Sequence, residues 1–258
     1  MDYKPSWYKS PINLPRGRSG KMMVRHRIIP VGSEVRIVGM RQAMLRGMVP
    51  VSARLDDSLK VHELVEEDVG VWMSDLPEEL NQIAELLATV KPRGRVLVGG
   101  LGLGILAKAV SERLGVDDVF VVEHSPDVIK LCRAPGYRVQ EDDIGAFLRW
   151  HVEPFDFYLL DTWQGTNEGT WWDTVLPLRR TIRNRWGRKP VVHCWAEDIM
   201  LGQVFGSLVT KPPHWYYREL QMPMSKTEAR RFVSDVGLPA WERKFGAAVD
   251  TVLAPSGD

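Results

Sequence analysis

The sequence predicts a doubly wound, mostly parallel α/β sheet preceded by a small β-rich N-terminal appendage. Short apolar runs alternate with helical patterns from about residue 95 onward, and the glycine-rich turn GGLGLG at 99–104 joins the first run to a helix. Such alternation is typical of parallel sheets with helices on both faces. We therefore divide the chain into a basic arm with a small β-rich region, 1–70, and an α/β domain, 71–258.

The N-terminal region is basic and predicted to contain short strands. Its first fifty residues carry ten Lys or Arg against two acids, Asp2 and Glu34. The first twenty residues contain Pro and Gly without a sustained period and are expected to be extended or poorly ordered. From 24 to 71, runs such as VRIVG and KVHELV, broken by Gly, Pro and Asp-Asp, predict small antiparallel strands.

The elements of the α/β region follow from its apolar periodicity. The 3-4 spacing of apolar residues over 77–90 predicts an amphipathic helix that begins at Pro77. Ser125 is expected to cap a helix that begins with Pro126. Strands are predicted at 95–98, 119–123, 137–140, 155–161 and 191–195, and further helices at 103–114, 126–132, 144–151 and 172–184. The tail adds a helix near 198–208, an aromatic strand at 214–220, and helices near 226–236 and 239–249.

Composition indicates an ordinary globular protein. The 258 residues are 44% hydrophobic and 26% charged, and the formal net charge of +1 gives no overall attraction for nucleic acid. The N-terminal stretch lacks a charged flank followed by an apolar run, and no apolar run is long enough to span a bilayer. We expect a cytoplasmic protein with no membrane contact. Cys132 and Cys194 lack metal-ligand spacing and are expected to be buried free thiols; no metal site is predicted.

The glycine turn is the main candidate for a ligand site. Its glycines allow backbone amides to approach a ligand closely. The run DVFVVE ends in Glu123, 19 residues after Gly104, where a carboxylate can accept hydrogen bonds from both ribose hydroxyls. Further carboxylates, Asp142 with Asp143 and then Asp161, follow the next two predicted strands, at the edge where open α/β sheets bind ligands. An empty turn and an NAD site, which GLGILA also fits as G-x-G-x-x-A, remain alternatives.

Four segments together resemble the class I S-adenosylmethionine-dependent methyltransferases, and within them the spermidine synthase-like branch. They are VLVGGLGLG, VVEHSPDVI, EDDIGAFL and FYLLDTW, within residues 70 to 195. The resemblance implies the Rossmann-like methyltransferase fold and S-adenosylmethionine, or its decarboxylated form, as the cofactor. It implies cofactor contacts for the loop residues Gly100, Leu101, Gly102 and Gly104, for Glu123 at the ribose, and for His124 beside the adenine.

The same resemblance implies roles for acids near the adenine and the acceptor substrate. Asp142 and Asp143 are both candidates for the adenine amino group, and the D-x-x-x-x-L spacing to Leu148 favours Asp143. Asp161 would face the transferring group and is the candidate catalytic residue, with a solvated strand end as the alternative. Asp75 and Trp163 are candidate contacts of the acceptor substrate.

The reaction is less specified than the cofactor. Aminopropyltransferases carry a second acid shortly after the fourth-strand aspartate, and this chain has Gln164 there. No (Asn/Asp)-Pro-Pro-(Tyr/Phe) motif follows that strand, which argues against the usual amino-methylating DNA enzymes. The sequence therefore favours a methyltransferase of undefined acceptor substrate. An aminopropyltransferase is the second hypothesis, and a non-catalytic nucleotide-binding or interaction protein is the third.

A small molecule is the expected acceptor substrate. Nucleic acid is the alternative, through the basic segments 1–50 and 179–189, the second of which carries six positive charges. Solvated surface charge explains both segments equally simply. Trp163, Trp171 and Trp172 are expected either to form an aromatic wall beside the acceptor substrate or to pack in the core.

Overall fold

The computed structural model describes residues 2–3, 9–39, 43, 49–163, 165–187, 189–200 and 203. Internal contacts divide the chain into two units, Met1–Thr162 with Arg180–Trp195, and Trp163–Arg179 with Ala196–Asp258. The division of the chain at residue 70 stays a prediction. Residues 197–200 are helical, at the start of the helix predicted near 198–208. The elements predicted at 214–220, 226–236 and 239–249 lie outside the described residues.

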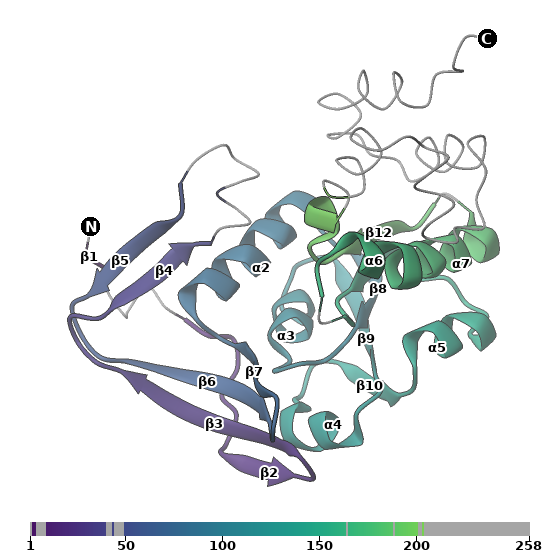
Figure 1. Ribbon diagram of the computed structural model, residues 1–258. Coiled ribbons are helices and arrows are strands. Elements are labelled where there is room, and N and C mark those ends of the chain that lie inside the picture. The colour runs from purple at the N-terminus through teal and green to yellow at the C-terminus, as the bar shows by residue number, and fades with distance from the viewer. Residues whose placement is uncertain are drawn as a thin grey trace. The chain divides into compact units, whose positions relative to one another are not determined.

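A five-stranded parallel sheet forms the centre of the first unit (Figure 1). Its strands are β8 (Gly94–Gly99), β9 (Val116–Glu123), β10 (Arg138–Glu141), β11 (Phe157–Leu160) and β12 (Val191–Cys194), in the order β10-β9-β8-β11-β12. The helices that follow β8, β9 and β10 are α3 (Ile105–Ser111), α4 (Pro126–Cys132) and α5 (Ile144–Trp150), and α2 (Pro77–Val90) precedes β8. The predicted doubly wound α/β fold is confirmed. The winding reverses at β8, and such switch points are where open sheets bind ligands.

Two smaller sheets precede the parallel one, as the β-branched runs predicted. The first is antiparallel, with order β2-β3-β6-β7, and consists of β2 (Gly17–Ser19), β3 (Met22–Ile29), β6 (Leu59–Glu66) and β7 (Gly70–Ser74). The second has the order β1-β5-β4 and consists of β1 (Asp2–Tyr3), β5 (Val51–Leu55) and β4 (Glu34–Val38). Strand β2 lies within the first twenty residues because Gly20, at φ 51°, turns the chain back into β3.

Two predicted helices have different bounds in the structure. The helix expected at 103–114 is α3, which starts only at Ile105 because Gly104 takes a left-handed φ of 78° as its N-cap. The helix expected at 172–184 begins earlier, where Asn167 accepts a hydrogen bond from Thr170 N. It runs through α6 (Glu168–Thr170), the π-helix η2 (Trp171–Val175) and α7 (Leu176–Trp186). Only the tertiary structure reveals the π turn, because its apolar spacing also suits an α-helix.

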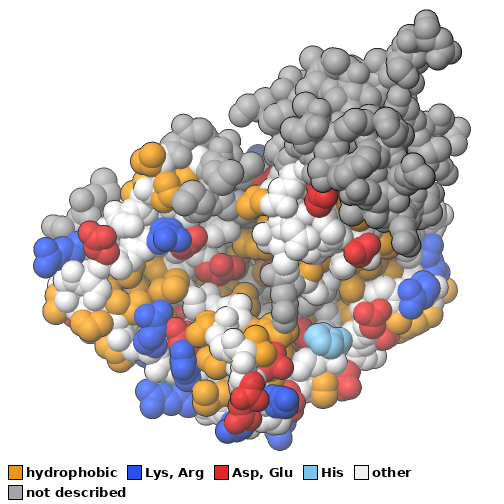
Figure 2. Space-filling model, in the orientation of Figure 1, with side chains coloured by type: hydrophobic (Ala, Val, Ile, Leu, Met, Phe, Trp, Pro, Cys, Tyr) orange, Lys and Arg blue, Asp and Glu red, His pale blue; other side chains and the backbone are white. Residues whose placement is uncertain are grey.

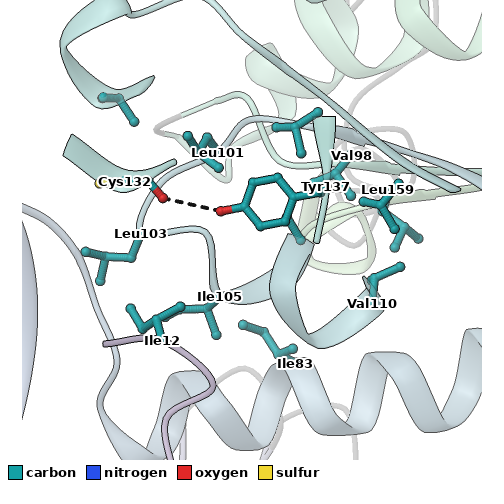
Figure 3. Packing of buried hydrophobic residues seen from close by; sticks show 14 of the residues in the cluster. Ile12, Ile83, Val98, Leu101, Leu103, Ile105, Val110, Cys132, Tyr137 and Leu159 are labelled. Atoms are coloured by element: carbon teal, nitrogen blue, oxygen red, sulfur yellow. Dashed lines mark hydrogen bonds between the residues drawn. The ribbon is translucent and has the colours of Figure 1, made fainter. Parts of the chain in front are cut away.

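The hydrophobic core of the first unit extends beneath the glycine turn. Leu101 and Leu103 alternate with glycines and are buried, so the turn is anchored through its side chains. Figure 3 shows them near Tyr137, whose hydroxyl donates to the carbonyl oxygen of Cys132 at 3.3 Å. Within the turn only Gly100 and Gly102 are partly exposed, so what the turn offers to solvent is backbone.

Both cysteines are buried free thiols, as predicted. Burial, together with the nearby Glu123 carboxylate, raises the pKa of Cys132 from 9.0 to about 12. Burial also raises the pKa of Tyr137 and of Tyr158 from 10.0 to about 12. Between about pH 9 and pH 12, all three groups therefore tend to stay neutral in the folded protein, whereas they ionise in the unfolded chain.

Alkaline pH is expected to destabilise the protein through these groups. Because folding raises the three pKa values, their stabilising contribution is complete below about pH 9 and is lost as the pH rises toward 12. Urea unfolding followed at pH 8, 9 and 10 should show a falling free energy of unfolding. At pH 8, iodoacetamide should modify Cys132 only in urea, and rapid modification of Cys132 in the folded protein would contradict this account.

In the part of the chain that the structure describes, no helix is long and apolar enough to cross a membrane.

Candidate functional site

The glycine turn lies directly against the end of β11. Gly100, Gly102 and Gly104 have positive φ values of 88°, 51° and 78°. A Cβ atom on Gly100 would lie 2.2 Å from the carbonyl oxygen of Asp161, and one on Gly104 would lie 2.6 Å from the Tyr137 hydroxyl. Glycine is therefore required by sterics as well as by φ, and the turn is held close to the carboxyl edge of the sheet.

Glu123 ends β9 and links the turn to the next segment of the chain. Its side chain is nearly buried, with Oε2 accepting a hydrogen bond from Leu101 N and Oε1 one from Ser125 N, both at 2.8 Å. A carboxylate offers about four lone-pair sites, so acceptor capacity remains for other donors. The exposed His124 lies beside it, with Nδ1 at 3.2 Å from Oε1. Glu123 thus sits at the edge with its orientation fixed by two backbone amides.

Asp142 and Asp143 follow β10 at the same edge but have different partners. Asp142 accepts hydrogen bonds on both oxygens, from Asp143 N at 2.8 Å and from the Trp150 indole at 2.9 Å. Asp143 caps α5 by accepting from Ala146 N at 2.8 Å through Oδ1. Its Oδ2 has no partner among the described residues, so Asp143 is the better placed of the two to accept from a ligand. Their roles at the adenine stay predictions.

Asp161 follows β11, next to the first glycines of the turn. Its backbone N donates to Gly99 O at 2.8 Å, and its own carbonyl oxygen is the atom that a Cβ on Gly100 would meet first. Because β9, β10 and β11 are parallel to β8, the acids that follow them meet the turn at one edge. The structure therefore brings Glu123, Asp143 and Asp161 to the edge where the turn lies, as the strand-end pattern predicted. The catalytic role of Asp161 stays a prediction.

Strand β7 contributes a contact to the turn that the sequence analysis missed. The thioether sulfur of Met73 accepts a hydrogen bond from Leu103 N at 3.0 Å. A Cβ on Gly102 would lie 2.2 Å from the same sulfur. A methionine in WMSDLPEE gives no local signal of this role, because the contact joins residues 30 positions apart.

Asp75 is fully buried and paired with a histidine. Its Oδ1 accepts from His62 N at 2.6 Å and its Oδ2 lies 2.7 Å from His62 Nδ1. His26 packs edge-on against His62, with ring centroids 4.7 Å apart. The other ring nitrogen of His62, Nε2, is buried and has no partner among the described residues. Asp75 thus orients His62, and its contact with an acceptor substrate stays a prediction.

The tryptophans that follow Asp161 belong to the second unit. Trp163 is half-buried. Trp171 is 1% exposed, packs edge-on against Trp172 and donates from its indole to Glu197 at 3.3 Å. Glu197 also accepts from Arg179 Nε at 2.6 Å. Core packing therefore accounts for Trp171, while Trp163 stays a candidate contact of the acceptor substrate. Gln164 lies outside the described residues.

The N-terminal basic segment is partly neutralised by acids from elsewhere in the first unit. Arg25 and Arg27 both bind Glu63, each with Nε 2.6 Å from a carboxylate oxygen. Although burial raises the pKa of Glu63, hydrogen bonds from the two arginines hold it below its ordinary value. Arg18 pairs with Glu67 and Arg36 with Glu78. On the face shown in Figure 2, basic and acidic side chains accordingly lie close together over the N-terminal strands. Nucleic-acid contact through 1–50 and 179–189 stays a prediction.

Among the described residues, no group of three or more His, Cys, Asp or Glu side chains is arranged to hold a metal ion.

No family model matches this chain, and no curated protein matches it. Solved structures similar to it include a spermidine synthase in complex with the transition state analogue AdoDATO, at 14% identity and a TM-score of 0.39, covering 63% of this chain and 64% of that one. A TehB-like SAM-dependent methyltransferase from Corynebacterium glutamicum has 21% identity and a TM-score of 0.34, covering 43% and 60%. A SAM-dependent methyltransferase from Archaeoglobus fulgidus has 20% identity and a TM-score of 0.33, covering 44% and 48%.

The match thus spans less than two thirds of the length of each of these three proteins. TM-scores this low say nothing about activity, so the evidence on activity comes from the residues of the site.

Proposed function

We propose that this protein is an S-adenosylmethionine-dependent group transferase, and specifically a methyltransferase. The observation that carries the proposal is the position of Glu123. Its nearly buried carboxylate is fixed by Leu101 N and Ser125 N at the carboxyl edge of the sheet, beside the glycine turn. A carboxylate so fixed can accept from both hydroxyls of a ribose.

The hydrogen bonds of the turn favour this cofactor over a dinucleotide. A pyrophosphate is bound by several backbone amides that point at it. Here Gly100 N donates to Val122 O, Leu101 N to Glu123 and Gly104 N to Leu101 O. Leu103 N donates to Met73, and only Gly102 N has no described acceptor. Even when the weak thioether acceptor of Met73 is displaced, only Gly102 N and Leu103 N are open, and so few amides suit a ligand without a pyrophosphate.

Transfer from a sulfonium makes few demands on the protein. The leaving thioether is already activated, so catalysis consists mainly of holding the acceptor substrate in line with the methyl carbon and excluding water. An amine or hydroxyl that attacks the carbon must lose a proton, and Asp161 is our candidate to orient that group or to accept the proton.

Calorimetry with S-adenosylmethionine, its decarboxylated form and NAD tests the cofactor. Binding of S-adenosylmethionine supports the proposal. Binding of the decarboxylated form alone would identify an aminopropyltransferase instead. Binding of NAD alone, or of none of the three, would overturn the proposal.

The variant Asp161→Asn is expected to bind S-adenosylmethionine within about twofold of the wild-type affinity but to transfer its methyl group at least about tenfold more slowly, because the amide is a poor proton acceptor. The measurement is S-adenosylhomocysteine formation with a panel of amine and hydroxyl substrates. Asp156→Asn is the matched control, because Asp156 directly precedes the same strand. The asparagine side chain keeps a carbonyl oxygen that can accept the hydrogen bond from Arg95 N. Unchanged turnover of Asp161→Asn would remove Asp161 from the catalytic machinery.

A further inference from the structure

Met73 accepts a hydrogen bond from the glycine turn that a ligand could easily replace. Of the five amides from Gly100 to Gly104, three donate to backbone carbonyls or to the fixed carboxylate of Glu123, and Gly102 N has no acceptor among the described residues. Leu103 N instead donates to the Met73 thioether at 3.0 Å. A thioether is a weak acceptor on a side chain with three rotatable bonds, so this hydrogen bond costs little to replace.

The backbone of β7 places Met73 at the turn. Met73 pairs with Leu64 of β6, and the next pair along the hairpin is Val65 with Val71. This shift in register leaves Trp72 without a partner in β6. Such bulges change the direction of neighbouring side chains and are common beside functional sites. The side chain of Met73 packs against the core that contains Leu101 and Leu103.

We propose that Met73 occupies the place of the cofactor's α-carboxylate at Leu103 N, and that displacement of its thioether lets Leu103 N select S-adenosylmethionine over the decarboxylated form, with Met73 as the competing acceptor that limits this preference. The inference rests on the proposed function and deepens it, because the presence of the carboxylate separates methyl donors from aminopropyl donors.

The chemistry of the two cofactors gives the selection. The carboxylate of S-adenosylmethionine can accept from Leu103 N, and a charge-assisted hydrogen bond is roughly twice as strong as a neutral one. Exchange of the thioether for the carboxylate is therefore favourable. The decarboxylated cofactor ends in an ammonium group, which has donors only and cannot accept from an amide. It leaves Met73 on Leu103 N and gains nothing from the exchange.

Substitution of Met73 tests the competition directly. Met73→Ala removes the competing acceptor, so the affinity for S-adenosylmethionine should rise about 3- to 10-fold, the value of one hydrogen bond, while the affinity for the decarboxylated form changes less than about twofold. Calorimetry with both ligands measures the ratio of the two affinities in the wild-type protein and in the variant. Val71→Ala is the matched control: it lies on the same strand, is 49% exposed, and should leave both affinities unchanged.

Methyl spectra of the wild-type protein test the displacement of Met73 itself, and a variant is needed only to assign the signal. With the methionines labelled at the Cε carbon, the Met73 signal can be assigned among ten methionines by its loss in Met73→Leu. S-adenosylmethionine and S-adenosylhomocysteine, which both carry the carboxylate, should shift this signal. Decarboxylated S-adenosylmethionine and methylthioadenosine, which both lack it, should not.

The outcomes separate this inference from the proposed function. If the protein binds S-adenosylmethionine while the Met73 signal stays in place, or if ligands with and without the carboxylate shift it equally, the inference is overturned and the proposed function stands. If calorimetry detects neither cofactor, both are overturned.

Discussion

Gly100→Ala is expected to lower the free energy of unfolding by about 2–4 kcal/mol and to abolish cofactor binding. Two effects add at this position. A side chain at φ 88° is strained, and its Cβ would lie 2.2 Å from the carbonyl oxygen of Asp161. That oxygen belongs to the backbone at the end of a central strand, so the turn must move away from the edge that Glu123 and Asp161 share. Urea unfolding and calorimetry with S-adenosylmethionine measure the two losses.

Gly187→Ala is the matched control for this prediction. Gly187 has a similar φ of 73°, but a Cβ there would meet no described atom within 4 Å. The substitution should therefore lower the free energy of unfolding only by the backbone strain, about 1–2 kcal/mol, and leave cofactor affinity unchanged. Equal losses in the two variants would show that the collision with Asp161 is absent. Gly102→Ala should have an intermediate effect, because its Cβ would meet the flexible Met73 side chain.

The sequence predicts the parallel sheet and most of the acids at its carboxyl edge, because each of these features is marked by residues close together in the chain. Ser125 and Pro126 mark the start of α4, and the structure has that helix at the predicted Pro126–Cys132, with Ser125 accepting from Val128 N. The strand-end acids are equally local signals. A carboxylate directly after a buried strand in a parallel sheet can lie only at the carboxyl edge.

Contacts between distant parts of the chain have no such signal. The contact of Met73 with Leu103, the pairing of His62 with Asp75, and the two arginines on Glu63 all depend on how β6 aligns with its neighbours. The acidic partners of arginines in the first fifty residues could not be predicted from the sequence for the same reason. Four of these arginines pair with acids that lie beyond residue 60, namely Glu63, Glu67 and Glu78.

Glu123→Ala is expected to weaken binding of S-adenosylmethionine at least about 100-fold, because hydrogen bonds from two ribose hydroxyls to a charged acceptor are lost. It should also lower the free energy of unfolding by about 2–4 kcal/mol, since Leu101 N and Ser125 N lose their acceptor. Calorimetry and urea unfolding separate the two effects.

Glu141→Ala controls for the loss of a carboxylate at this edge. Glu141 ends β10 exactly beside Glu123 in the register of the parallel pair, but it is exposed. Its substitution should change neither stability nor affinity beyond about 0.5 kcal/mol. If Glu123→Ala destabilised the protein yet kept full affinity, Glu123 would be a structural residue that holds the turn, and the ribose assignment on which the cofactor depends would fail. If Glu123→Ala loses affinity and Glu141→Ala does not, the cofactor binds specifically to Glu123, the carboxylate that the turn orients.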